Sequence, residues 1–447
     1  MKADGMMGMV ASKWTAVALA TILHFLVDGL CVCSLYLMAR TETVYDWAGL
    51  LLTYNLLAFV TQPLTGWWTD RMHRLHWALL LSIGLLTTAV VLLMVAARWL
   101  QSATVGYWLV AILLGLGNSL FHVWGGKMTV RVVGNDMRAL GIFVSTGAVG
   151  LVVGVTCAAW WLAAGMMLLI ALVGMLAIRI PVAVTESVEG SRSEFCRLHT
   201  NRLQLPRTWE IWLIPILLFV FVRSFMGESI PLNLEKDNTM LFVLAATAMA
   251  GKAGGGWVAY RWGVGTAIVA CVGVAAACLL WIVTGTTQLT AVLIGVLAIN
   301  FTMPMTLYLA NRVLPGREGQ AFGLLAAVLV PGYMLAHSGS LLFNVDFMLA
   351  ALLLTISVEL GMLRLMGEKS RRVFVGAVII NILTNVPLNL VLLTVGSSVV
   401  GLLTGELLVM LVEALGYYFL VHSWKRAIVY SLLCNVASFV VGALIQI

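Results

Sequence analysis

The sequence has few charged residues. Asp, Glu, Lys and Arg make up 10% of its 447 residues, whereas a soluble domain carries about 25%. So few charges cannot cover a water-facing surface of this length. This excludes a soluble enzyme, a disordered chain and a secreted disulfide scaffold. The seven cysteines show no metal-ligand spacing, and no phosphate-binding G-x-x-x-x-G-K-[ST] loop is present, so ATP is not expected to drive the protein.

Hydrophobic residues dominate instead, at 62% of the sequence, with a mean hydropathy of +1.02. A spanning helix needs about 20 apolar residues. Apolar runs of this length lie at 14–38, 47–69, 77–97, 105–127, 139–160, 161–181, 209–231, 240–260, 264–285, 288–313, 321–342, 346–366, 373–395, 397–420 and 425–445. They predict an all-α polytopic membrane protein with no cleaved leader. Its expected parts are a six-helix bundle (14–181), a cytoplasmic linker (182–208), a second six-helix bundle (209–366) and a three-helix membrane module (373–447).

The distribution of Lys and Arg predicts the orientation. With a cytoplasmic N-terminus, every loop Lys or Arg except Arg40, Arg98 and Lys236 falls on the cytoplasmic side. Cytoplasmic loops of membrane proteins are enriched in these residues. We therefore expect a bacterial inner-membrane protein whose C-terminus, after fifteen spans, lies outside.

Two short patterns occur twice. Gly66-Trp67-Trp68-Thr69-Asp70-Arg71 follows the second run, and Gly256-Trp257-Val258-Ala259-Tyr260-Arg261 follows the eighth. Arg138-Ala139-Leu140-Gly141 is echoed by Gln320-Ala321-Phe322-Gly323. Such duplication predicts two six-helix halves in parallel orientation.

Gly66-x-x-x-Asp70-Arg71-x-x-Arg74 resembles motif A of the major facilitator superfamily. Gly117–His122 and Gly251–Gly256 resemble segments of its fosmidomycin-resistance-type efflux branch. The resemblance covers residues 14–366. It implies two halves that rock about a midplane site. The three-helix module predicted at 373–447 lies beyond the resemblance, as a C-terminal extension. A gating role without substrate contact is expected for Gly66, Asp70, Arg71, Arg74, Gly256 and Arg261.

The chemistry of this motif supports gating. Glycines let neighbouring helices approach closely. Asp70 at a membrane edge can accept hydrogen bonds from helix N-terminal amides and pair with Arg71 or a nearby basic residue. We expect this cluster to hold the two halves together on the cytoplasmic side. An ordinary charge cluster in a cytoplasmic loop is the alternative.

Ionisable residues at membrane depth are functional candidates, because a charge there costs a few kcal/mol unless paired or hydrated. His24 and Asp28 share one face of the first span, and His122 lies in the fourth. We predict that they form a proton relay, because histidine changes charge near neutral pH. Two imidazoles and a carboxylate also suit a transition metal, and a structural hydrogen-bonded role is the third alternative.

Arg223 in the seventh span lies at the depth of Asp28 in the first. We expect the two to meet across a central cavity, directly or through substrate, although Arg223 could instead bind an anionic group bidentately. A static buried pair is the alternative. Lys252 either faces the cavity and attracts anions or snorkels to the interface. The predicted substrate-binding set also contains four amides, Asn55, Gln62, Asn118 and Asn300. Glu359 lies deep in the twelfth span and needs a partner that the sequence does not identify.

The last three spans carry polar stripes. They comprise Asn381, Asn385 and Asn389 on the first, Glu406, Glu413 and Tyr417 on the second, and Asn435 on the third. We expect these stripes to face inward and satisfy one another as the polar core of a module. An ion or proton site at Glu406 and Glu413, or a dimerisation surface, are the alternatives.

Together these features predict a secondary active transporter. It would move a small organic solute, anionic or amphiphilic, across the membrane by alternating access, as proton-coupled export. The same fold allows uptake or lipid or lysolipid flipping. An intramembrane enzyme and a non-transporting sensor are alternatives of other classes. The expected partners are the solute, protons and the bilayer, with no cofactor, no metal and no nucleic acid, and the oligomeric state is left open.

Overall fold

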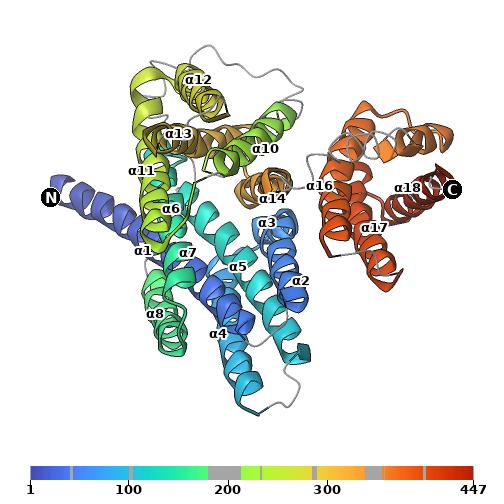
Figure 1. Cartoon of the computed structure of the whole chain (residues 1–447). Coiled ribbons are helices and arrows are strands. Elements are labelled where there is room, and N and C mark those ends of the chain that lie inside the picture. The colour runs from blue at the N-terminus through green and yellow to red at the C-terminus, as the bar shows by residue number, and fades with distance from the viewer. Residues whose placement is uncertain are drawn as a thin grey trace. The chain divides into compact units, whose positions relative to one another are not determined.

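The computed structural model describes residues 2–40, 44–99, 104–179, 213–231, 234–283, 289–337, 355–356, 358–395 and 399–445. Every regular element among them is a helix (Figure 1). The all-α prediction is confirmed, and eight described helices are long and apolar enough to cross a membrane. The predicted linker at 182–208 lies outside the described residues.

The first six apolar runs form nine helical segments. These are α1 (Lys2–Ala39), α2 (Val44–Asn55), η1 (Leu56–Val60), α3 (Gln62–Asp70), α4 (His76–Trp99), α5 (Thr104–Val133), α6 (Met137–Ser145), α7 (Gly147–Thr156) and α8 (Trp160–Arg179). The second run is interrupted by the π-helical segment η1 and by Pro63 at the start of α3. Proline lacks the N–H that would continue the ladder, and π-helical turns often accompany functional sites. The fifth run is interrupted at Thr146.

The remaining described helices follow the other runs. They are α10 (Leu213–Ser229), α11 (Asn238–Trp262), α12 (Val264–Val283), α13 (Leu289–Val313), α14 (Glu318–His337), α16 (Arg371–Val395), α17 (Val399–Val421) and α18 (Trp424–Ile445). Residues 358–365 are also helical. Asp136 and Asp237 begin α6 and α11 as N-caps, because their carboxylates accept backbone N–H groups at the open helix end.

The chain forms two compact units, Met1–Leu329 and Val330–Ile447. The first unit contains the first predicted half and the second as far as Leu329, within α14. In the second unit, Leu363 packs with residues of α16, α17 and α18 in one apolar cluster. The part of the twelfth run that the structure describes therefore belongs with the three C-terminal helices. The boundaries predicted for the four parts stay predictions.

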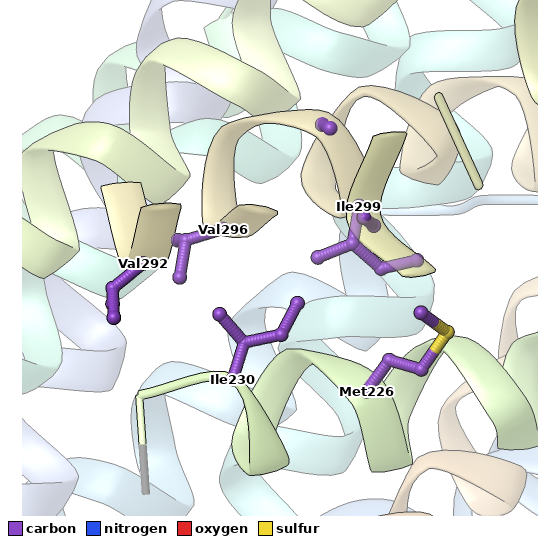
Figure 2. Packing of buried hydrophobic residues seen from close by; sticks show 7 residues of the cluster. Met226, Ile230, Val292, Val296 and Ile299 are labelled. Carbon is purple, nitrogen blue, oxygen red and sulfur yellow. The ribbon is translucent and has the colours of Figure 1, made fainter. Parts of the chain in front are cut away.

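An apolar cluster joins α10 to α13 in the first unit. Met226 and Ile230 of α10 pack against Val292, Val296 and Ile299 of α13 (Figure 2). Arg223, Met226 and Ile230 are buried and follow one another at spacings of three and four residues, which places them on one stripe of the helix. A guanidinium is thus carried on the same stripe as the apolar side chains that face α13.

Candidate functional site

Three side chains of the first unit meet at one point. His24 and Asp28 lie one turn apart on α1, and His122 comes from α5. His24 Nε2 lies 3.2 Å from Asp28 Oδ2, and His122 Nε2 lies 3.5 Å from Asp28 Oδ1. The two Nε2 atoms are 3.0 Å apart. The structure thus brings together the three residues predicted for proton coupling, which we name the histidine–aspartate cluster.

Backbone carbonyls determine which ring nitrogen of each histidine carries a hydrogen. His24 Nδ1 lies 2.7 Å from the carbonyl oxygen of Phe143, and His122 Nδ1 lies 3.1 Å from that of Asn118. A carbonyl oxygen only accepts, so we assign both Nδ1 atoms as donors. In neutral rings both Nε2 atoms are then acceptors. Two nitrogen lone pairs and a carboxylate face one another, and such an arrangement needs one cation.

A glycine of α7 makes room for the cluster. A Cβ at Gly147 would overlap Asp28 Oδ2 and would lie 2.7 Å from His24 Nε2. The preceding Thr146 donates its hydroxyl to the carbonyl of Thr21 on α1 at 2.7 Å. This bond holds the beginning of α7 against α1. Backbone, rather than a side chain, therefore covers the cluster on this face.

The cluster can hold either a metal ion or a proton. Its three ligand atoms lie within 4.8 Å of one another, and imidazole ligands of metals commonly donate their other N–H to a carbonyl. A proton on one Nε2 satisfies the same geometry, because an imidazolium donates to the second ring and to the carboxylate. The ammonium of Lys252 on α11 lies within electrostatic range of Asp28. This positive charge repels a divalent cation more strongly than a proton.

Tyr54 and Asn118 extend the cluster between α2 and α5. The side-chain amide of Asn118 donates to the Tyr54 hydroxyl, and its backbone carbonyl accepts from His122. Both residues are buried, and Asn118 Oδ1 has no hydrogen-bond partner among the described residues. Asn118 was among the predicted substrate-binding residues, whereas Tyr54 was missed. A single tyrosine in an apolar run gives no signal that separates it from an interface anchor.

Arg223 does not lie against Asp28. The Asp28 carboxylate contacts the two histidines, and in the described part of the chain no ion pair within 4.0 Å joins it to Arg223. The expected direct contact between the first and seventh spans is therefore absent. The reason is helix rotation. Asp28 faces α5 and Gly147 of α7, whereas Arg223 lies on the α10 stripe that packs toward α13.

The other predicted amides are bonded to nearby backbone, Asn55 and Asn300 within their own helices and Gln62 of α3 to the preceding η1. Asn55, Gln62 and Asn300 each donate to the carbonyl four residues earlier, at 2.8–2.9 Å. Such bonds satisfy an amide N–H at membrane depth. The described contacts join none of the three to the histidine–aspartate cluster. Asn300 does lie beside the Lys252 region, because a Cβ at Gly251 would be 2.8 Å from Asn300 Cβ.

Asp70, at the end of α3, joins the two halves of the first unit. Its Oδ1 accepts the N–H of Gly319 and its Oδ2 that of Gln320, each at 2.9 Å. These amides begin α14, where the helix dipole favours a negative charge. Oδ1 also accepts from Lys127 Nζ at 2.7 Å, and the two side chains are 7% and 0% exposed.

Lys127, rather than Arg71, is the basic partner of Asp70. The predicted span ended at residue 127 and placed this lysine in a cytoplasmic loop. In the structure α5 continues to Val133, so Lys127 lies on a buried helix and also donates to the Thr69 carbonyl at 2.8 Å. Arg71 lies instead over the Trp67 ring, 3.8 Å from its centre. Arg71, Arg74 and Arg261 are exposed.

The main chains of α3 and α14 touch beside Asp70. A Cβ at Gly66 would overlap the carbonyl oxygen of Gly319, and one at Gly323 would overlap that of Gln62. Only glycine allows helices to approach this closely. The α3–α14 crossing thus depends on Gly66, from the first copy of one repeated pattern, and Gly323, from the second copy of the other.

The second copy of the motif makes an equivalent crossing between α11 and α6. A Cβ at Gly256 would overlap the carbonyl oxygen of Met137, and one at Gly141 would lie 2.5 Å from that of Lys252. These contacts again join the two halves. The repeat seen in the sequence therefore corresponds to two glycine-mediated crossings, α3 with α14 and α11 with α6.

The polar chemistry of the second crossing is different. Tyr260 stands where the first copy has Asp70. The guanidinium of Arg138 lies 5.1 Å from the ring centres of Trp257 and Tyr260 and pairs with Asp136 at 2.7 Å. A cation–π contact takes the place of the carboxylate and helix dipole. Both crossings lie at the helix ends next to Arg-rich loops, so the halves are in contact on that side.

The second unit contains a separate buried polar cluster. Thr384 Oγ1 and Asn385 Nδ2 of α16 donate to Glu413 Oε1 at 2.9 and 3.4 Å. Asn435 of α18 donates to the other oxygen of Glu413. One buried carboxylate of α17 therefore connects all three C-terminal helices, an arrangement typical of interhelical polar contacts in membranes.

Glu359 joins this cluster. It accepts a hydrogen bond from Asn381 at 2.5 Å and one from the Tyr417 hydroxyl at 3.4 Å. The sequence required a partner for Glu359 without identifying it, because the partner comes from beyond the predicted domain boundary. The side chains of Asn389 and Glu406 lie outside the described residues.

Comparison with known proteins identifies the family and the fold. The family model of the Major Facilitator Superfamily matches residues 16–337. The Escherichia coli fucose:proton symporter FucP is similar in structure, with 12% identity, a TM-score of 0.54 and coverage of 75% of this chain and 93% of that chain. FucP in the outward conformation has 13% identity and a TM-score of 0.53, and the match covers 75% of this chain and 93% of that chain. A bacterial homologue of the iron transporter ferroportin, in its outward-facing state with soaked iron, has 14% identity and a TM-score of 0.50. That match covers 88% of this chain and 99% of that chain. Curated protein sequences give no match.

Proposed function

We propose that this chain, which belongs to the Major Facilitator Superfamily, exports a small organic solute across the bacterial inner membrane in exchange for protons. The family and the membrane-spanning helices make the chain a multi-pass secondary transporter, not an enzyme. The observation that carries the proton proposal is the 3.0 Å contact between His24 Nε2 and His122 Nε2 beside Asp28. Three acceptor groups that converge on one point bind one proton well.

Binding of a proton changes the charge of the cluster. With neutral histidines, the Asp28 carboxylate gives it one negative charge, and one proton makes it neutral. A net charge at membrane depth costs a few kcal/mol unless it is compensated. Asp28 belongs to the first half, and Lys252, within its electrostatic range, belongs to the second. Proton uptake therefore weakens an attraction between the halves, which links it to their rocking.

The crossings of α3 with α14 and of α11 with α6 support alternating access. Both join the halves at the ends next to Arg-rich loops, which the positive-inside rule places in the cytoplasm. Access from the cytoplasm then requires the Asp70 contacts with Gly319 and Gln320 to break. We propose that these contacts close the cytoplasmic gate.

Flux measurements in proteoliposomes with an imposed pH gradient test this function. A panel of labelled organic solutes identifies one whose flux depends on the gradient in the parent protein. Asp28→Asn and His122→Gln are expected to make that flux independent of the gradient. His73→Gln changes an exposed loop histidine and should behave as the parent. An Asp28→Asn protein with the pH dependence of the parent would falsify proton coupling at this cluster.

A further inference from the structure

Two cations in the second half of the first unit lie in the interior without a contacting counter-ion. Arg223 of α10 is 8% exposed, and its Nε atom has no hydrogen-bond partner among the described residues. Lys252 of α11 is half-buried. In the described part of the chain neither cation has an ion pair within 4.0 Å. Because a buried charge without a contacting counter-ion is unfavourable, the placement of Arg223 indicates a role that requires positive charge.

The two cations lie close enough to affect each other. The Arg223 charge lies within electrostatic range of the Lys252 ammonium, as do the carboxylates of Asp28 and Glu228. Asp28 is engaged by the two histidines at 3.2 and 3.5 Å. Two like charges repel when brought together away from water. An anion bound between them would relieve this repulsion.

The surroundings of these cations are partly polar and partly apolar. Met226 and Ile299 belong to the apolar cluster between α10 and α13 (Figure 2), and Arg223 lies on the same α10 stripe as Met226. Asn300 follows Ile299 and touches Gly251, the neighbour of Lys252. Three helices thus contribute a positive, hydrogen-bonding region next to an apolar one.

We infer that Arg223 and Lys252 bind the oxyanion of the transported solute, a carboxylate or phosphate carried on a small organic body. A guanidinium offers a planar pair of donors to two oxygens, and an ammonium adds a point charge. The adjacent apolar cluster fits the organic body. The identity of the anion as cargo rests on the proposed transport function, whereas its binding does not depend on proton coupling.

Thermal unfolding of the purified full chain in neutral detergent tests the binding. The probes are benzoate, its uncharged analogue benzamide, and inorganic phosphate. A ligand that binds only the native state raises the melting temperature. We expect a rise of about 2 °C or more with saturating benzoate or phosphate, and none with benzamide. Arg223→Gln and Lys252→Gln should lose the rise, whereas Arg98→Gln, an exposed cation, should keep it.

The melting temperature without anion separates binding from folding. Removal of a buried uncompensated charge should leave Arg223→Gln as stable as the parent or more stable. If Arg223→Gln does not fold, Arg223→Lys takes its place, because it keeps the charge and loses the planar fork. It should retain only part of the benzoate shift.

Two further measurements of the benzoate shift identify the source of the anion and separate anion binding from proton coupling. Loss of the benzoate shift in phosphatidylglycerol micelles, but not in phosphatidylcholine micelles, means that a lipid headgroup supplies the oxyanion. Retention in both means a free solute. Asp28→Asn should keep the benzoate shift even if proton coupling fails. No shift by any anion in the parent, or equal shifts in the parent and both glutamine variants, overturns the inference.

Discussion

His24 and His122 face each other with their Nε2 atoms 3.0 Å apart, while both Nδ1 atoms contact backbone carbonyl oxygens. With no added proton, the lone pairs of the two Nε2 atoms face each other. With two added protons, two N–H donors face each other. Only the state with one shared cation gives a favourable contact, and Asp28 then balances its charge. The geometry therefore favours one shared cation, which we propose is a proton.

Gly147→Ala should disable the histidine–aspartate cluster without unfolding the protein. The added Cβ would overlap the Asp28 carboxylate, so Asp28 must leave the two histidines. We expect the gradient dependence of flux to fall at least tenfold, measured in proteoliposomes. Gly165→Ala is the matched control, because its Cβ would meet no atom within 4 Å. Equal pH profiles for the two variants would contradict the role of Gly147.

Asp70 and Lys127 should behave as a coupled pair. Removing one partner of a buried ion pair leaves an uncompensated charge and costs about 3–5 kcal/mol. Asp70→Asn and Lys127→Met are each expected to lower the melting temperature of the full chain. The double variant should be more stable than Lys127→Met alone. Additive losses would show that the 2.7 Å contact contributes no coupling free energy.

Gly66→Ala should separate the halves at the α3–α14 crossing. The new Cβ would overlap the backbone carbonyl of Gly319, and backbone cannot rotate out of the way. Spin labels are placed at His73 and Arg317 in a protein without native cysteines. Electron paramagnetic resonance should then give a longer distance between the labels with Gly66→Ala than without it. Gly273→Ala, with no atom within 4 Å of its Cβ, should leave the distance unchanged. The same distance in both variants would show that Gly66 does not set the crossing.

Glu368 should stabilise the second unit at neutral pH. Burial alone would raise the pKa of Glu368, but hydrogen bonds from the Ser370 N–H, the Tyr430 hydroxyl and the Lys369 N–H, with the charge of Arg426, hold it below its usual value of 4.5. Its stabilisation is thus complete above the unfolded pKa and is lost as pH falls through the lower folded pKa.

The corresponding experiment follows melting temperature against pH. Glu368→Gln should be less stable than the parent at pH 7, and the difference should shrink in acid. Glu235→Gln, an exposed carboxylate, should match the parent throughout. A difference between the parent and Glu368→Gln that does not change with pH would show that ionisation of Glu368 is not the cause.

The fold class and the family were predictable from the sequence. Long apolar runs and the motif around Asp70 led to an all-α protein of the superfamily, and both are confirmed. The likeness to the fosmidomycin-resistance-type branch and the orientation stay predictions. The breaks at Thr61 and Thr146 were missed, because an interrupted helix keeps the composition of a continuous one.

Contacts between helices were less predictable. Positions four apart placed His24 and Asp28 on one face, since helical spacing is local. The direct contact expected between Asp28 and Arg223 is absent among the described residues, and contact through substrate stays a prediction. Asp70 was expected to pair with Arg71 or a nearby basic residue, and the sequence did not identify that residue as Lys127. Equal depth in the membrane states nothing about the direction in which each helix faces.

Composition and the order of charges by themselves determined that this chain crosses a membrane as helices, because hydrocarbon leaves backbone amides no partner outside their own helix. Rotation and approach of the helices were decided only in three dimensions. Glycines at 66 and 147 allow backbone to lie where a side chain would otherwise stand. That close packing selects which polar groups, among many at similar depth, come within hydrogen-bond distance.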